Sequence, residues 1–495
     1  MPPPQLKLNK MGWRISTRSD RSTNTDLMEG PTPRHSLLSG RYKQSFAYLT
    51  LRTRMPGIMQ QVIMRVTGDI PDLVIKYGED VRKDVKQIVD AIERLKMELN
   101  RDRQFLLFHG SEPDKAEWNA FLTEMPRPKR SFFRACWLHA ECYLYRRIFS
   151  FFENSRFLHT YDCFDHLKQE DLMMSDAAMR ALARATRSLP RSYDVFSKLL
   201  TINLWGNHFE MQLGAFEFDE EDDQNDINVL VKVVDIDKII LVNDSPLIWN
   251  CLVKNNKTSE DRIVDFVCDN GGFEFFTDMI LLEYMVENKL ATQVRVHVKA
   301  IPWYISDVTR ADVDWTMEYL IGNRDELLSS VGKKWARLMS SEKIVIAPTS
   351  YFWTGPQPYF VMVESDLELY RTLTTSRLAI FKGDLNYRKL MGDYIWDSAE
   401  EFITCLRGFR PTNICALRSV KCEVVCGLPE GLADALLRAD HNWMISGDYG
   451  VIQYTDSLKC SCALPGQEDH LRDDPGTALV APQSQRSTLL MTPSG

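Results

Sequence analysis

The feature that most constrains the fold is the rhythm of the chain after about Val229, where short β-branched runs alternate with helical segments. Helical patterns lie between most of the runs, notably at 273–289 and 367–376. Parallel strands need such crossovers, and burial of both faces favours continuously apolar runs. The sequence therefore predicts an α/β fold, a helix–sheet–helix sandwich around a largely parallel, Rossmann-like sheet. The predicted strands are residues 238–242, 262–267, 294–298, 344–346, 378–381 and 414–417.

The first half of the chain has a different, helical character. Apolar side chains within 81–99 recur at steps of four and three, which marks one face of an amphipathic helix. A second predicted helix, at 132–152, is apolar nearly all round and carries Glu141, Arg146 and Arg147. Because burial would oblige these charges to pair, we interpret them as structural ion pairs. A place at the edge of an active site is the alternative.

These patterns divide the chain into four parts. Residues 1–40 and 459–495 are polar and show no periodicity, so both are predicted to be disordered tails. Residues 41–228 are predicted to form an all-helical domain, and residues 229–458 an α/β domain that binds metal and carries catalysis. The acidic run at 216–226 is interpreted as a solvated loop between the two, with metal capture as the minor alternative.

Composition narrows the choice of partners and compartment. The formal net charge is −8, and no basic field points to nucleic acid. The longest apolar runs, such as 239–242 and 279–282, are far too short to cross a bilayer, so no membrane partner is expected. The 11 cysteines are scattered and fit neither a zinc knuckle nor a disulfide framework. Reduced thiols and a cytoplasmic location follow, with the nucleus as a second compartment.

Carboxylates and amides follow several predicted strands, at the place where parallel sheets bind ligands. Asp269 and Asn270 follow one strand, and Asp307 follows the next. Helix capping or a tight turn explains any one such loop, but four loops that converge on one edge favour a site. Oxygen ligands of this kind suit a hard divalent cation such as Mg²⁺ or Mn²⁺. His297, within its strand, is interpreted as packed rather than ligating.

The segment 382–389 resembles an anion cradle. Gly383 permits close approach of the backbone, and the helix that starts after it offers free N–H groups. Asp384 and Asn386 are candidates for hydrogen bonds to sugar hydroxyls. Lys421 ends another strand, so it is a candidate for reaching the same phosphate as a point charge.

At these segments the sequence resembles the metal-dependent damage-control phosphatases, and within them the third, eukaryotic subfamily. The resemblance runs from about Tyr42 to Tyr454. Ser419 stands where the subfamily's R-T-x-K signature has threonine, a change that keeps the hydroxyl. The motifs that carry the resemblance are D-N-G-G-F-E at 269–274, I-P-W at 301–303 with S-D at 306–307, G-D-L-N-Y-R-K at 383–389 and R-S-V-K at 418–421.

The resemblance implies hydrolysis of small phosphorylated metabolites, among them fructose 1-phosphate, fructose 6-phosphate and related sugar phosphates, in metabolite damage control. The implied cofactor is Mn²⁺, Co²⁺ or Ni²⁺, with Mg²⁺ as a further candidate. Asp269, Asn270 and Asp307 are implied to hold the metal and to take part in catalysis. The implied substrate contacts are Asp269, Asn270, Asp384, Leu385, Asn386, Tyr387, Arg388 and Lys421.

The same resemblance carries an alternative activity, the S-adenosylmethionine-dependent O-methylation of protein glutamates, with Glu274 as a contact of the methyl donor. The sequence has no glycine-rich G-x-G-x-G loop after the first predicted strand, which is the usual signature of methyl-donor binding. The helix dipole explains an acid at Glu274 equally well. A non-catalytic protein that binds protein partners through the acidic loop from Asp219 to Asp226 and through its tails is a third hypothesis.

Overall fold

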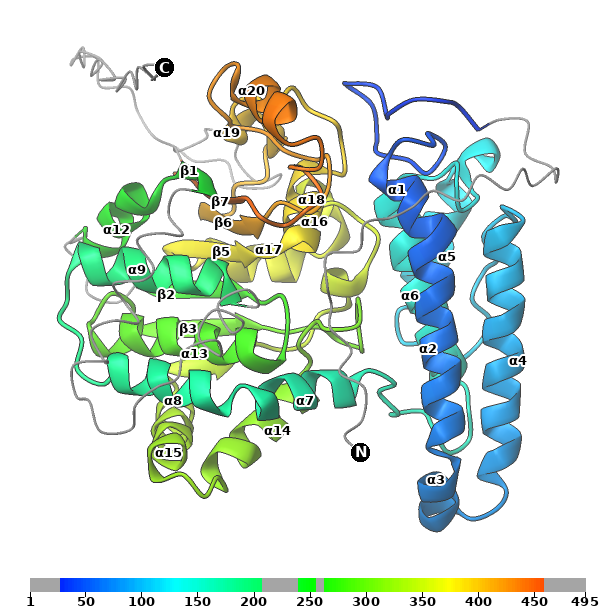
Figure 1. Ribbon diagram of the computed structural model, residues 1–495, viewed down its shortest axis with the longest axis horizontal. Coiled ribbons are helices and arrows are strands. Elements are labelled where there is room, and N and C mark those ends of the chain that lie inside the picture. The colour runs from blue at the N-terminus through cyan, green and yellow to red at the C-terminus, as the bar shows by residue number, and fades with distance from the viewer. Residues whose placement is uncertain (1–26, 207–238, 255–261, 458–495) are drawn as a thin grey trace, which may run out of the picture. The chain divides into compact units, whose positions relative to one another are not determined.

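The computed structural model describes residues 27–206, 239–254 and 262–457 (Figure 1). All of them belong to one compact unit that ends at Ser457. Within these residues seven strands form a single sheet, and helices pack on both of its faces. The prediction of an α/β sandwich around a largely parallel sheet, preceded by helices, is therefore confirmed.

Five neighbouring strands of the sheet run parallel, and two run against them. The strand order is β1-β7-β6-β5-β2-β3-β4, in which β6 and β7 are antiparallel and every other pair is parallel. The predicted runs correspond to all of the strands but β7. The strands are β1 (Ile240–Asn243), β2 (Ile263–Val267), β3 (Gln293–His297), β4 (Ile344–Ile346), β5 (Leu378–Lys382), β6 (Asn413–Ser419) and β7 (Gly450–Thr455).

Alternate residues of the central strands enter two separate hydrophobic cores. In β5, Leu378 and Ile380 lie in what we call the first core, whereas Ala379 and Phe381 lie in the second core, on the opposite face of the sheet. Figure 1 shows several helices of the first core running in front of the strands. The helices that contribute to the first core are α7 (Asp165–Met174), α8 (Asp176–Ala185), α9 (Tyr193–Leu204), α12 (Ser245–Val253), α13 (Gly272–Glu287), α14 (Arg310–Ile321) and α15 (Glu326–Ser340).

The second core joins the other face of the sheet to the first helices of the chain. The predicted helices at 81–99 and 132–152 correspond to α4 and α6. The helices of this core are α1 (Phe46–Leu49), α2 (Met55–Gly68), α3 (Ile70–Tyr77), α4 (Val81–Asn100), α5 (Lys115–Glu124), α6 (Trp137–Glu153), α16 (Met362–Ser365), α17 (Leu367–Thr374), α18 (Asp384–Met391) and α19 (Phe402–Cys405), with α20 (Leu432–Ala439) at its margin.

The helices before residue 206 serve both faces of the sheet. Those from α1 to α6 pack in the second core, whereas α7, α8 and α9 pack in the first, against β2 and α13. The predicted division at residue 228 would separate α7, α8 and α9 from the strands that they cover, and it stays a prediction. The predicted acidic loop at 216–226 and the C-terminal tail lie outside the described residues.

The disordered N-terminal tail was predicted to extend to residue 40, which is too far, because residues before 40 already belong to the fold. Leu38 is fully buried in the second core. Its N–H donates to the carbonyl of Asp393 (2.8 Å), and its own carbonyl accepts from the N–H of Trp137 (2.8 Å). These backbone hydrogen bonds anchor a segment whose polar composition gave no sign of order. Residues 1–26 lie outside the described residues.

Among the predicted charges of α6, Glu141 and Arg146 are buried and paired, with partners from other elements and, for Arg146, also with Glu153 at the end of the same helix. Glu141 accepts from the guanidinium of Arg388 (2.7 Å). Arg146 lies between Asp114 (2.5 Å) and Glu153 (2.8 Å) and is fully buried. Since removing one member of a buried pair is strongly destabilising, these contacts fix α6 against its neighbours.

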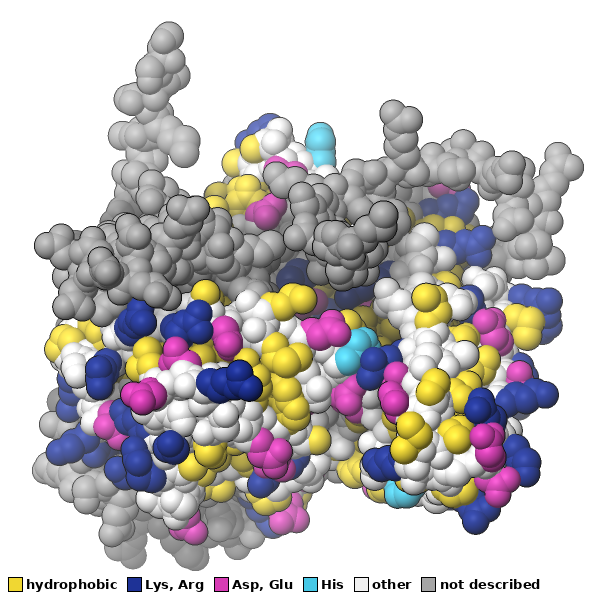
Figure 2. Space-filling view, turned by 60° about the horizontal axis from the view of Figure 1, so that its bottom comes forward, with side chains coloured by type: hydrophobic (Ala, Val, Ile, Leu, Met, Phe, Trp, Pro, Cys, Tyr) yellow, Lys and Arg dark blue, Asp and Glu magenta, His cyan; other side chains and the backbone are white. Residues whose placement is uncertain are grey.

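Smaller expectations from the sequence can be checked directly. The nine cysteines within the described residues are all free thiols. The imidazole Nε2 of His297 lies 2.7 Å from the Oδ1 of Asp265, so this histidine is packed and paired inside the sheet. No helix in the described ranges is long and apolar enough to span a membrane. On the face shown in Figure 2, acidic and basic side chains are interspersed.

Candidate functional site

The two central strands, β2 and β5, separate at their carboxyl ends. Their pairing ends at Val267 and Phe381. In the next residues, the N–H of Cys268 donates to His297 on the β3 side (3.0 Å), and the N–H of Gly383 donates to the carbonyl of Leu417 on the β6 side (2.8 Å). The chain runs from β2 outward to β3 and β4 and then returns to β5, so this is the topological switch point of the sheet. Ligands bind at such points in open α/β sheets.

Asn386 bridges the two strands where they separate. Its Nδ2 donates to the carbonyls of Cys268 (3.2 Å) and Lys382 (2.6 Å), and its Oδ1 accepts from the hydroxyl of Tyr359. These hydrogen bonds engage both the amide nitrogen and the amide oxygen of a side chain that is almost fully buried. The sequence predicts Asn386 as a substrate contact, but its side chain is occupied in holding the crevice together.

The carboxylate of Asp269 lies directly over the backbone of Gly383. A Cβ atom on Gly383, whose φ is +95°, would lie only 2.0 Å from the Cγ of Asp269. Burial raises the pKa of Asp269 well above its usual range, and the nearby carboxylates of Glu274 and Asp307 raise it further. A carboxylate in this position strongly favours a proton or a cation beside it.

Asn270 connects the carboxylates around Asp269. Its Nδ2 donates to Asp269 (3.2 Å) and to Glu274 (2.9 Å), and its Oδ1 accepts from the hydroxyl of Ser306 (2.6 Å). Its backbone forms an antiparallel bridge with Asp307. The structure therefore brings Asp269, Asn270 and Asp307 together, although two loops supply them.

Asp307 is held by a lysine that the sequence did not single out. The Nζ of Lys299 lies 3.1 Å from the Oδ2 of Asp307 and also donates to the carbonyl of Cys268 (3.0 Å). Burial raises the pKa of Asp307, and the charge of Lys299 opposes that shift. The available signal was the position of Lys299 directly after the third predicted strand.

The donor set at this edge fits a hard divalent cation. Two carboxylates and one amide oxygen are the ligand types that such ions prefer. The raised pKa of Asp269 and the like charges around it indicate that a cation would be favoured here. As they stand, the side chains are not arranged around an ion, and the described ranges hold no group of three His, Cys, Asp or Glu residues so arranged. Rotation of the Asn270 amide would turn its oxygen toward Asp269 and Glu274.

A small pocket opens over this crevice, and Lys421 contributes a positive charge to it. The charge of Lys421 lowers the pKa of Asp269, opposing the effect of burial. By contrast, Lys382 is paired with Glu274 (3.1 Å) and with Asp278. The pocket is lined by Leu204, Trp205, Asp269, Glu274, Lys382, Gly383, Leu417, Ser419 and Lys421.

The other predicted substrate residues do not line this pocket. Asp384 accepts from Arg418 (2.8 Å), and the hydroxyl of Tyr387 donates to Gln453 (2.9 Å). Leu385 is buried in the second core. The side chains of Leu385 and Tyr387 are therefore committed to the interior, whereas the first N–H groups of α18 have no partner inside the helix.

Arg388 is committed to buried partners. Its guanidinium pairs with Asp393 (2.7 Å) and with Glu141 of α6 (2.7 Å). It also lies 3.6 Å from the ring centroid of Trp137. These contacts give Arg388 a structural part between α18 and α6, and its predicted contact with substrate stays without support from the structure.

Glu274, the residue of the methyl-donor alternative, lies in the first turn of α13 and is almost fully buried. Its two carboxylate oxygens are engaged by Asn270 (2.9 Å) and Lys382 (3.1 Å). These two partners account for a buried acid at this position without a methyl donor.

The glycines of the Asp269 loop are also required by their surroundings. Gly272 has a φ of +65°, and a Cβ there would lie 2.1 Å from a carboxylate oxygen of Asp171 in α7. That oxygen accepts from the N–H of Phe273 (2.8 Å), so Asp171 caps α13 from another helix. Asp171 is far away in the sequence, and no local signal identified it.

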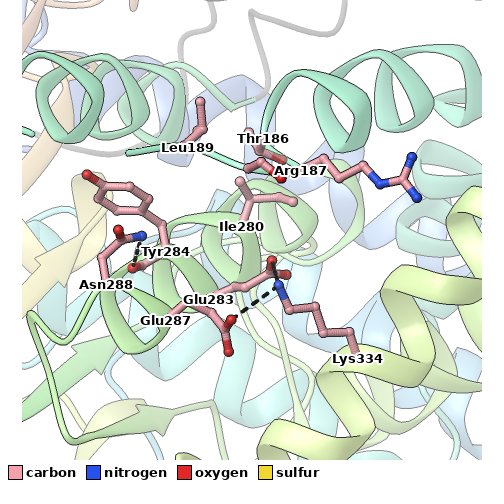
Figure 3. Close-up of a pocket in the computed structure, with 10 residues that line it drawn as sticks. Thr186, Arg187, Leu189, Ile280, Glu283, Tyr284, Glu287, Asn288 and Lys334 are labelled. Atoms are coloured by element: carbon pink, nitrogen blue, oxygen red, sulfur yellow. Dashed lines mark hydrogen bonds and ion pairs between the residues drawn. The ribbon is translucent and has the colours of Figure 1, made fainter. Parts of the chain in front are cut away.

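A second pocket lies at the other end of α13, away from the carboxyl ends of the parallel strands (Figure 3). Its volume is about 230 Å³. Lys334 reaches across it to Glu283 (2.6 Å) and Glu287 (3.7 Å). The two carboxylates make this pocket unsuited to a phosphate group.

Comparison with known proteins shows the family to which the chain belongs. The family of the damage-control phosphatase ARMT1-like domain matches residues 50–436. The chain belongs to this family. Membership of the damage-control phosphatases makes the chain a phosphatase enzyme of metabolite damage control, and it confirms the resemblance seen in the sequence. The metal dependence of the family, in general terms, agrees with the oxygen donors around Asp269.

Individual damage-control phosphatases support the assignment over nearly their whole length. The protein named damage-control phosphatase ARMT1 from Danio rerio is 33% identical over 449 residues, covering 86% of this chain and 98% of the relative. The mouse protein of that name is 34% identical over 440 residues, covering 86% and 99%. The human protein is 34% identical over 440 residues, covering 85% and 98%. A crystal structure of a DUF89 family protein from Pyrococcus horikoshii is 17% identical, with a TM-score of 0.41, and covers 82% of this chain and 97% of that chain.

Proposed function

We propose that this phosphatase hydrolyses sugar phosphates, such as fructose 1-phosphate and fructose 6-phosphate, at the crevice between β2 and β5. The observation that carries the proposal is the partly buried Asp269 carboxylate placed over Gly383 at the switch point of the sheet. Support for a phosphomonoester comes from the small size of the pocket and from the positive charge of Lys421 at its rim. The resemblance of the sequence supports the sugar phosphates.

Asp269, Asn270 and Asp307 would hold a divalent cation, for which we propose Mn²⁺, Co²⁺ or Ni²⁺. When bound, such an ion acts as a Lewis acid that polarises a phosphoryl oxygen. The remaining work of the chain is to orient the phosphate and to stabilise charge, because phosphoryl transfer passes through a loose transition state. Lys421 would neutralise a phosphate oxygen. The first N–H groups of α18, which begins directly after Gly383, would donate hydrogen bonds to the same phosphate.

The walls of the pocket suggest how the rest of a sugar phosphate is accommodated. Trp205 and Leu204, at the end of α9, contribute apolar atoms to the lining, and both side chains are buried. They would limit the space available beside the phosphate. For the attacking group we favour water over the Asp269 carboxylate, because a carboxylate that binds a cation is a poorer nucleophile.

Phosphate release from the purified protein tests the proposal. A panel of sugar phosphates is incubated with Mn²⁺, Co²⁺ or Ni²⁺, and with a chelator as control. We expect metal-dependent release that is fastest with fructose 1-phosphate or fructose 6-phosphate. Fast release from other phosphomonoesters and none from the two fructose phosphates would contradict the proposed substrate class. Absence of release from every substrate, together with micromolar binding of S-adenosylmethionine in equilibrium dialysis, would favour methyl transfer instead.

A further inference from the structure

The loop that carries Asp307 contains the most strained backbone in the described residues. Tyr304 has a φ of +45° and Ile305 a φ of +75°, and they are the one pair of consecutive non-glycine residues with positive φ in the described ranges. Such values are costly for any side chain and are rare for a β-branched one. Strain of this kind persists only where the surroundings enforce it, and it is concentrated at functional sites.

The strained turn delivers two residues to the site. It closes with a hydrogen bond from the N–H of Asp307 to the carbonyl of Trp303 (3.1 Å). The carbonyl of Ser306 then accepts from the N–H of Gly271 (2.7 Å), while the hydroxyl of Ser306 donates to the side chain of Asn270 (2.6 Å). The conformation of this turn therefore decides where Asp307 lies relative to Asn270.

Helix α6 holds the turn in place through an aromatic stack. The ring of Tyr304 stacks on that of Tyr145, with centroids 4.5 Å apart and planes at 25°. Its hydroxyl lies 3.6 Å from the Sγ of Cys142, one turn earlier on the helix. Glu141 ties α6 in turn to Arg388 of α18, which begins at the other side of the crevice. The helix thus contacts both loops between which the site lies.

We propose that Tyr304 is a positioning residue, through which α6 holds the strained turn and so places Asp307 at the metal site. The inference rests on the proposed metal-binding role of Asp307. It gives α6 a part in the reaction, although no residue of that helix lines the pocket. In this account the stack with Tyr145 stabilises a turn that would otherwise relax and carry Asp307 away from Asn270.

The test compares Tyr304→Leu with Tyr304→Phe and with a matched control, a second ring that stacks on a tyrosine of α6. Phe105→Leu removes a stack of nearly the same geometry, 4.4 Å and 28°, between Phe105 and Tyr143 of α6. The measurements are the Kd for Mn²⁺ by calorimetry, kcat and KM for phosphate release, and the melting temperature. We expect Tyr304→Leu to weaken Mn²⁺ binding about tenfold and to lower kcat more than it raises KM. Tyr304→Phe, which keeps the ring, should restore both values, and Phe105→Leu should change only the melting temperature.

Ile305→Gly provides an independent variant that removes strain instead of packing. Glycine adopts the positive φ of this position without a steric penalty. We expect the melting temperature to stay the same or to rise and the Kd for Mn²⁺ to stay at the wild-type value, because the stack with Tyr145 is kept and the native turn no longer carries a steric penalty. This outcome would separate the two contributions, since positioning of Asp307 is then lost only when the ring contact is removed.

Two results would overturn the inference. Equal Mn²⁺ affinity in the wild-type protein and Tyr304→Leu would show that the stack does not position the site, while leaving the proposed function intact. Absence of Mn²⁺ binding by the wild-type protein would overturn the proposed site and this inference together. If Tyr304→Leu does not fold, Tyr145→Leu, which removes the same stack from the side of α6, decides the matter by the same measurements.

Discussion

Gly383→Ala perturbs the crevice in a way that can be worked out from the structure. Gly383 lies between β5 and α18 with φ +95° and ψ 168°. This backbone region is essentially restricted to glycine, and other residues there lose about 1–3 kcal/mol. We therefore expect the free energy of unfolding to fall by that amount.

The same substitution also displaces the carboxylate at the centre of the site. The new Cβ would lie 2.0 Å from the Cγ of Asp269, about 1.4 Å short of the 3.4 Å at which ordinary contact begins. Relief of this clash requires the Asp269 carboxylate to move by a similar distance. Since a misplacement of about 1 Å can lower a rate about 10²-fold, we expect kcat/KM to fall by at least that factor.

Gly78→Ala separates the two effects. Gly78 follows α3 with φ 84° and ψ 175°, nearly the same backbone conformation as Gly383, but no atom lies within 4 Å of the position that a Cβ would take there. Both variants are compared by denaturant unfolding and by steady-state phosphate release. We expect similar losses of stability, with the loss of turnover confined to Gly383→Ala. Full activity in Gly383→Ala, or an equal loss of activity in both variants, would refute the reasoning.

Three further predictions follow from particular contacts. Arg388→Leu leaves the buried carboxylates of Glu141 and Asp393 without their cation, so denaturant titration should show a loss of about 3–5 kcal/mol; a loss no larger than that of a surface variant would contradict the structural part assigned to Arg388. Lys421→Ala removes a charge at the rim of the pocket, so kcat/KM should fall about 10²-fold at an unchanged melting temperature, and unchanged kinetics would place Lys421 outside the site. Burial and like charges raise the pKa of Asp269. Protons should therefore compete with the metal as the pH falls, raising the apparent Kd for Mn²⁺ about tenfold per pH unit below that pKa; calorimetric titration that shows a pH-independent Kd would contradict this.

Much of the fold could be predicted from local patterns, whereas long-range pairing could not. The apolar runs identified the parallel strands, because burial on both faces leaves a continuous hydrophobic stretch. Strand β7 (Gly450–Thr455) was missed. It lies between β1 and β6, and its antiparallel pairing with β6 departs from the parallel pattern by which the other strands were identified. The periodicity of α4 revealed its apolar face but could not show which partner that face would meet.

At the site, too, local sequence patterns identified some of the residues, whereas pairings between residues far apart in the sequence could not be predicted. Asp269, Asn270 and Asp307 were found because they directly follow predicted strands, where ligands of parallel sheets bind. Arg388 and Asn386 were expected to contact substrate, but their side chains have internal partners that lie far away in the sequence. Pairings of that kind arise from packing, and no spacing in the chain reveals them.

The most direct test of the central claim, that the Asp269 crevice is the phosphatase site, is phosphate release by Asp269→Asn. The matched control is Asp314→Asn, which changes an exposed carboxylate of α14 that pairs with Arg310 (3.0 Å). The account predicts that Asp269→Asn folds, because burial disfavours the charge that it removes, and that it releases no phosphate with any metal, while Asp314→Asn keeps full activity. Metal-dependent release by Asp269→Asn at the wild-type rate would contradict the account.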